Sequence, residues 1–180
     1  MFCRNFLKNE LLLIVEVLNL QIKRDQQIIN IVGPTIEVGD LLPNAQLIDR
    51  NHQKVELKDY LKGTTVVSIV PDINTKTCDI QTSRFASIAL EQNYTFVTIS
   101  TNSPEDIMNW CQAANVDMIY LSDVERHFSQ AAGLLMAEYD KLARTVLVID
   151  GQGVIKYMEV VPDMRDEPNY TAALDAAAKL

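Results

Sequence analysis

The sequence has 180 residues, 48% of them hydrophobic and 22% charged, values typical of a single globular domain with a sizeable core. Its formal net charge of −8 at pH 7 argues against a nucleic-acid-binding protein, because phosphate contacts need a basic surface, and it also disfavours binding to anionic membranes. Three cysteines and two scattered histidines fit neither a secreted disulfide framework nor a metal site, so we expect a reducing compartment and no metal.

The amino-terminal seventeen residues contain a short apolar run, residues 11–15, between Glu10 and Glu16. Five apolar residues are fewer than the ~7–15 of a signal peptide and far fewer than the ~20 that cross a bilayer. We therefore expect residues 1–17 to be an N-terminal extension. A translation start assigned too early would explain these residues equally well. Residues 18–180 are expected to form one domain.

Short strands and one helical turn are expected first in this domain. In chain order they are strands at residues 18–23, 28–32, 45–49 and 55–57, and a helical turn at 57–61. The first two strands are expected to pair as a hairpin, because residues 24–27 have the composition of a turn.

Buried strands alternate with helices in the rest of the domain. Strands are expected at residues 64–70, 94–100, 119–121, 144–150 and 154–161, and helices at 79–92, 104–114, 126–132 and 169–180. The first two of these strands, linked through a helix, are expected to be parallel, whereas the last two, linked by Gly151-Gln152-Gly153, are expected to form an antiparallel pair. This order predicts an α/β protein with a thioredoxin-like fold, in which a central mixed β-sheet is flanked by helices and preceded by an N-terminal β-hairpin.

Cys78 lies between a buried strand and the helix that follows it. Backbone N–H groups at the amino end of a helix lack partners and favour negative charge, and the thiolate is the reactive form of cysteine. The sequence therefore predicts a nucleophile at Cys78. The alternative is that Cys78 is only a small buried hydrophobic residue.

Pro71, Thr75 and Cys78 fit the pattern Pro-x-x-x-Thr-x-x-Cys, and here the chain resembles the peroxiredoxins. Further segments spread over residues 18–180 resemble the bacterial thiol peroxidase branch of that family. They are Cys78-Asp79-Ile80-Gln81-Thr82, Trp110-Cys111, Leu142-Ala143-Arg144 and Glu167-Pro168-Asn169-Tyr170. Lys76 departs from the pattern, because related sequences usually have proline there.

This resemblance implies a role for each of five residues. Cys78 would be the peroxidatic cysteine, whose thiolate attacks the peroxide and becomes a sulfenic acid. Cys111 would be the resolving cysteine, which forms an intrachain disulfide with it. Thr75 would offer its hydroxyl to the peroxide and the thiolate, Arg144 would stabilise the thiolate and the leaving oxygen, and Pro71 would shield the site from water.

The resemblance also implies a thioredoxin-dependent thiol peroxidase that reduces organic hydroperoxides and hydrogen peroxide in antioxidant defence, without a metal or organic cofactor. It implies a homodimer in the bacterial cytoplasm. Two alternatives stay open at this point, a thiol-based redox sensor and a non-catalytic thioredoxin-fold binding module. Because the two cysteines lie on different expected helices and a disulfide needs Cα atoms within about 7 Å, we expect both helices to unwind partly when the disulfide forms.

Overall fold

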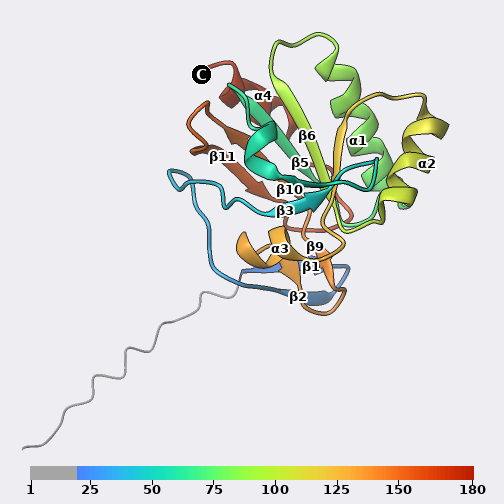
Figure 1. Cartoon of the computed structure of the whole chain (residues 1–180). Coiled ribbons are helices and arrows are strands. Elements are labelled where there is room, and N and C mark those ends of the chain that lie inside the picture. Colours follow the sequence, from blue (N-terminus) through green and yellow to red (C-terminus); the bar gives the residue numbers. More distant parts are fainter. Residues whose placement is uncertain (1–19) are drawn as a thin grey trace, which may run out of the picture.

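The computed structural model describes residues 20–180, so the expected extension at residues 1–17 and Cys3 lie outside the described residues. Figure 1 shows the described chain coloured from the amino to the carboxyl end. Among residues 20–180, no helix has both the length and the apolar character that a membrane span requires.

Strands and helices alternate along this chain much as the sequence predicts. The strands are β1 (Gln21–Arg24), β2 (Gln27–Val32), β3 (Gln46–Ile48), β4 (Lys54–Glu56), β5 (Thr65–Ile69), β6 (Thr95–Ser100), β7 (Ile119–Ser122), β8 (Leu135–Met136), β9 (Lys141–Leu142), β10 (Thr145–Ile149) and β11 (Ile155–Val160). The helices are the 3-10 helix η1 (Leu57–Tyr60) and α1 (Lys76–Ala89), α2 (Pro104–Ala114), α3 (His127–Ala131) and α4 (Tyr170–Ala177).

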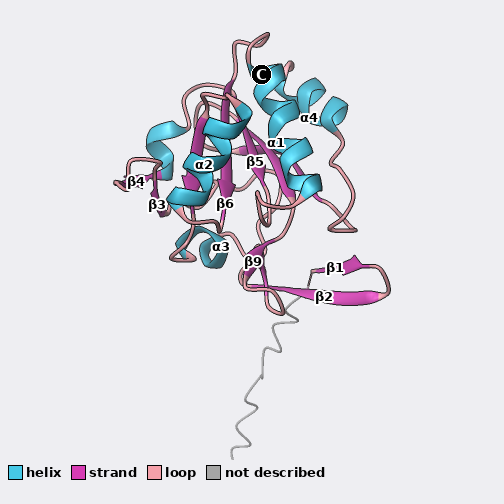
Figure 2. Cartoon of the chain, turned by 90° about the vertical axis from the view of Figure 1, so that its right-hand side faces the viewer, coloured by secondary structure: helices cyan, strands magenta, loops and turns pink. Residues whose placement is uncertain are grey.

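The main sheet has seven strands in the order β11-β10-β5-β6-β7-β3-β4. Strands β5, β6 and β7 are parallel, whereas β10 pairs antiparallel with both β5 and β11, so the expected mixed sheet is confirmed. Every residue of β5 and of β10 is buried, which explains why their sequences lack polar alternation. A second, small sheet has the order β1-β2-β8-β9 and contains the expected N-terminal hairpin, which extends away from the main sheet in Figure 2.

Helices cover both faces of the main sheet, because successive strand residues point to opposite sides. Val66 packs with Phe85 of α1 and Ala173 of α4 on one face. The neighbouring residue Val67 belongs to the core on the other face, together with Phe128 of α3. Helix α2 packs against β7 on the face that carries α1. The thioredoxin-like architecture is therefore present, and the end of β5 leads directly into α1.

Two features differ from the expectation. Helix α1 begins at Lys76 rather than at residue 79, because Thr75 has an extended backbone and its carbonyl accepts the first helical bond, from the N–H of Asp79, at 2.9 Å. Strands β8 and β9, which join the hairpin to the rest of the fold, were not predicted, since two residues show no periodicity.

Gly133, which follows α3, offers a test of how the small sheet is held. Its φ is +59°, and a Cβ atom there would lie 1.7 Å from the carbonyl oxygen of Pro34. Gly63 has nearly the same backbone angle, φ +63°, with nothing within 4 Å of its own Cβ position. Gly133→Ala should lower the free energy of unfolding by about 3–5 kcal/mol, and Gly63→Ala by only about 1 kcal/mol. Denaturant unfolding of both variants measures this difference, and equal losses would contradict the packing described.

Candidate active site

Cys78 lies in the first turn of α1 and lines a pocket of about 330 Å³. Its side chain is 1% exposed, so a reactant reaches the sulfur only through this pocket. Pro71, Thr75 and Arg144 line the same pocket. The structure thus brings four of the five predicted site residues together, although Arg144 is 66 positions away from Cys78 in the chain.

The guanidinium of Arg144 is buried beside the sulfur of Cys78. Its Nη2 donates to Cys78 Sγ at 3.4 Å and to the carbonyl oxygen of Met164 at 3.1 Å, and its Nη1 donates to Gln81 Oε1 at 2.6 Å. Arg144 is 2% exposed and has no ion pair with a carboxylate within the described residues 20–180. Because an uncompensated buried charge costs several kcal/mol, this arrangement favours a counter-charge at the neighbouring sulfur.

Gln81 is a functional residue that the sequence reasoning did not assign. It lies one turn after Cys78 on α1, is fully buried, and its amide nitrogen donates to Ser68 Oγ of β5 at 2.9 Å. Its amide oxygen accepts from Arg144, so Gln81 fixes the guanidinium relative to the sheet. The available signal was a polar residue on the face of a helix that packs on the sheet, because such a residue needs a buried partner.

Thr75 is the residue that precedes the first turn of α1. Within residues 20–180, its hydroxyl forms no hydrogen bond with the sulfur of Cys78. Its hydroxyl donates to the carbonyl oxygen of Asp72 at 2.8 Å. The side chain of Asp72 is held in turn by Asn102 at 2.9 Å and by an ion pair with Lys141. Burial alone would raise the pKa of Asp72, but the hydrogen bonds from Asn102 and Lys141 outweigh it and hold that pKa below its ordinary value. The lone pairs of the Thr75 hydroxyl oxygen remain free to accept a hydrogen bond from a reactant.

Five cationic side chains and one carboxylate, that of Asp72, lie in the wall of this pocket, and Asp72 is paired with Lys141. Besides Arg144, the cationic side chains are those of Arg24, Lys76, Lys141 and Arg165. Within residues 20–180, no three histidine, cysteine or acidic side chains gather so that they could hold a metal ion. The lining therefore suits an uncharged or anionic reactant and stabilises negative charge that develops on an oxygen atom.

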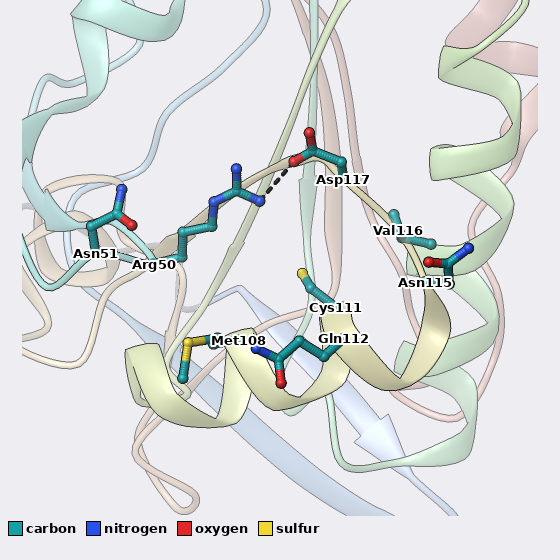
Figure 3. Close-up of a pocket in the computed structure, with 8 residues that line it drawn as sticks. All are labelled: Arg50, Asn51, Met108, Cys111, Gln112, Asn115, Val116 and Asp117. Atoms are coloured by element: carbon teal, nitrogen blue, oxygen red, sulfur yellow. Dashed lines mark hydrogen bonds and ion pairs between the residues drawn. The ribbon is translucent and has the colours of Figure 1, made fainter.

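Cys111 lies on α2 and opens to solvent through a different pocket, of about 520 Å³ (Figure 3). Its sulfur points towards an ion pair in which Arg50 Nη1 lies 2.6 Å from Asp117 Oδ1. Burial raises the pKa of the Cys111 thiol, while Arg50 lowers it and Asp117 raises it further. Cys78 and Cys111 are both free thiols, and they belong to one buried cluster.

A hydrogen bond joins the two helices next to these cysteines. The indole nitrogen of Trp110, which precedes Cys111, donates to Asp79 Oδ1, which follows Cys78, at 2.8 Å. Trp110 is the single tryptophan of the sequence and packs edge-on against Tyr120 with ring centroids 6.3 Å apart. Any approach of the two sulfurs that displaces α1 or α2 must strain or break this bond.

Comparison with known proteins finds close relatives along most of the chain. A family model described as Redoxin matches residues 37–174. The chain is 40% identical over 154 residues to a thiol peroxidase from Listeria innocua, covering 84% of this chain and 93% of that protein. It is 36% identical over 150 residues to a thiol peroxidase from Staphylococcus aureus, covering 82% and 92%. A peroxiredoxin-like protein from Aquifex aeolicus superposes with a TM-score of 0.82 at 25% identity, covering 88% and 96%.

The charges that face Cys111 predict opposite effects of two substitutions. In a Cys3→Ser/Cys78→Ser background, alkylation of Cys111 by iodoacetamide should follow a pH dependence displaced above that of a free cysteine, because burial raises its pKa. Arg50→Met should displace the profile further upward and Asp117→Asn downward, each by a few-fold in rate at pH 8, since the pair is partly exposed and screened. Arg84→Met, on a different surface ion pair, is the control. Displacements in the same direction would contradict the assignment.

Proposed function

This chain belongs to the Redoxin family, and from that premise we propose that it is a thiol-dependent peroxidase acting on organic hydroperoxides and hydrogen peroxide. The single observation that supports this most strongly is the buried Arg144 guanidinium, 3.4 Å from the sulfur of a pocket cysteine and without a carboxylate partner in the described chain. Such a pair holds an anionic sulfur where a small reactant can reach it.

In the first step, the thiolate of Cys78 attacks the distal oxygen of the hydroperoxide. An S–O bond forms as the O–O bond breaks, the sulfur is oxidised, and the other oxygen leaves as an alkoxide or hydroxide that takes up a proton. Arg144, with the cationic wall of the pocket, stabilises the charge that appears on the leaving oxygen.

Thr75 and Pro71 position the peroxide in this proposal. The Thr75 hydroxyl already donates its proton to the Asp72 carbonyl, so its oxygen accepts from the O–H of the peroxide. This is a narrower role than the expected one, in which the hydroxyl served both the peroxide and the thiolate. Pro71 is buried at the pocket wall and has no N–H to solvate, so it helps to exclude water.

Ionisation of a thiol cannot by itself produce a fast peroxidase. For thiols in general, a pKa lowered from about 8.5 to about 6 raises the ionised fraction at pH 7 about thirtyfold. Nucleophilicity falls by roughly tenfold over the same interval if peroxide attack follows the Brønsted slope of disulfide exchange. Only a few-fold gain remains, so positioned groups such as Arg144 and Thr75 must supply the larger part of the acceleration.

In the second step, Cys111 attacks the sulfenic sulfur of Cys78, which forms an intrachain disulfide and releases the oxygen as water. Both cysteines lie in the same buried cluster but on different helices, so the first turn of α1 and part of α2 must loosen, and the Asp79–Trp110 bond must break. We propose that a thioredoxin-type dithiol then reduces the disulfide, and that the protein works as a homodimer in the bacterial cytoplasm.

Counting thiols tests this function. One equivalent of cumene hydroperoxide should remove two of the three thiols of the reduced protein within seconds, and thioredoxin, thioredoxin reductase and NADPH should then sustain turnover. Cys78→Ser should abolish the loss, because the attacking sulfur is missing. Cys111→Ser should allow one oxidation followed by inactivation, since nothing resolves the sulfenic acid.

Cys3→Ser serves as the control and should behave like the unsubstituted protein. Two thiols lost without sustained turnover would instead identify a redox sensor, and no thiol loss would identify a binding module.

A further inference from the structure

Tyr120 carries a buried hydroxyl that the proposed mechanism does not yet use. It lies on β7, is 2% exposed, and its hydroxyl oxygen has no hydrogen-bond partner among the described residues. The hydroxyl of Ser100 is a neighbouring polar group that lowers the pKa of Tyr120, but the two hydroxyls do not form a hydrogen bond in this structure. Buried hydroxyls are almost always paired, because an unmet one costs about 1–3 kcal/mol, so this hydroxyl needs an explanation.

The surroundings of Tyr120 contain both cysteines. Tyr120, Cys78 and Cys111 belong to one buried cluster, to which α1, α2 and β7 each contribute. Tyr120 pairs with Thr98 of β6, and its strand also pairs with β3 at Ser122, so we expect Tyr120 to stay in place while the helices loosen. A disulfide between Cys78 and Cys111 would therefore form close to the phenol of Tyr120.

The ionisable groups around this compartment divide into two sets. Cys78, Cys111 and Asp72 face the phenol of Tyr120, and each would raise its pKa when charged. Arg50 and Asp117 form an ion pair near Cys111 and act on the pKa of its thiol in opposite directions. These two charges act against each other, and no side chain in residues 20–180 donates a hydrogen bond to the sulfur of Cys111.

We propose that Tyr120 is a positioning residue for the resolving step, whose hydroxyl donates a hydrogen bond to the sulfur of Cys111 when that sulfur ionises. The inference rests on the proposed peroxidase function. In this step Cys111 loses its proton and attacks the sulfenic sulfur of Cys78. The S–S bond forms, the S–O bond breaks, and the departing hydroxide takes a proton to become water.

Tyr120 acts here as a donor and not as an acid. Burial raises the pKa of Tyr120 far above its ordinary value, so the phenol keeps its proton over the whole working pH range. A donor that remains neutral can stabilise a thiolate by hydrogen bonding without ever transferring its own proton. It compensates in part for the cost of ionising a buried thiol.

Tyr120→Phe tests the proposal, because phenylalanine keeps the ring and its packing against Trp110 while it removes only the hydroxyl. Reduced protein is mixed with one equivalent of cumene hydroperoxide and quenched in acid at successive times. Intact-protein mass spectrometry then distinguishes the sulfenic acid from the disulfide. Sulfenic acid should form at an unchanged rate, and its conversion to the disulfide should slow about tenfold at pH 7.

The pH profile separates this role from a packing effect. The deficit should shrink as the pH rises and Cys111 ionises without help, whereas a packing defect slows conversion equally at every pH. The variant should unfold at the same temperature or higher, because it loses an unpaired buried hydroxyl. Tyr157→Phe, which removes a phenol that bonds Glu159 far from the cysteines, is the matched control and should convert normally.

An unchanged conversion rate in Tyr120→Phe, or a deficit that is the same at every pH, would overturn the inference while leaving the peroxidase function intact. Failure of the unsubstituted protein to form the sulfenic acid and disulfide would overturn the proposed function itself.

Discussion

A buried guanidinium beside a buried sulfur is the constraint on which the rest of this site depends. Arg144 contacts an amide oxygen, a carbonyl oxygen and Cys78, and all of these partners are neutral unless the cysteine is ionised. Removing such a cation from water costs several kcal/mol, which only nearby negative charge and good hydrogen bonds offset. The guanidinium is thus placed where it can interact with negative charge on the sulfur of Cys78 or on an oxygen atom beside it.

The topology of the sheet explains how two residues so far apart in the chain meet. Strand β10 runs antiparallel to β5, with Thr145 opposite Ile69. Arg144, just before β10, therefore lies at the edge of the sheet where β5 ends and α1 begins. Gln81 then ties the guanidinium to β5 through Ser68. A slip of one residue in this register would turn the Arg144 side chain to the other face of the sheet.

The two cysteines lie in one cluster but open to different pockets. Cys78 opens to a pocket with a cationic wall, and Cys111 opens to another pocket beside the Arg50–Asp117 pair, yet both contribute to one apolar cluster. In the proposed mechanism, the peroxide and the thiol of Cys111 thus approach the sulfur of Cys78 from different directions. In this structure, α1 and α2 are held together near the cysteines by apolar packing and by the Asp79–Trp110 hydrogen bond. We expect these contacts to break locally when the disulfide forms.

Much of the fold was predictable, because long buried strands such as β5 and β10 and the capped start of α2 leave strong patterns in the sequence. The sequence around Cys78 also placed this residue correctly at the start of a helix. Contacts set by tertiary packing were not predictable, among them the Gln81 bridge and the unpaired hydroxyl of Tyr120. The bond from Thr75 to Asp72 depends on a local turn whose geometry the sequence pattern does not determine.

The most direct test of the central claim is the rate at which hydrogen peroxide oxidises Cys78 when Arg144 is replaced. The account predicts that Arg144→Gln lowers the second-order rate constant by about tenfold to a hundredfold, the size expected from losing a charge-assisted hydrogen bond to sulfur. Arg144→Lys, which keeps the charge but not the planar fork, should fall in between, and Arg84→Gln on the exposed side of α1 should change little. A folded Arg144→Gln protein that reacts within twofold of the unsubstituted rate would contradict the account.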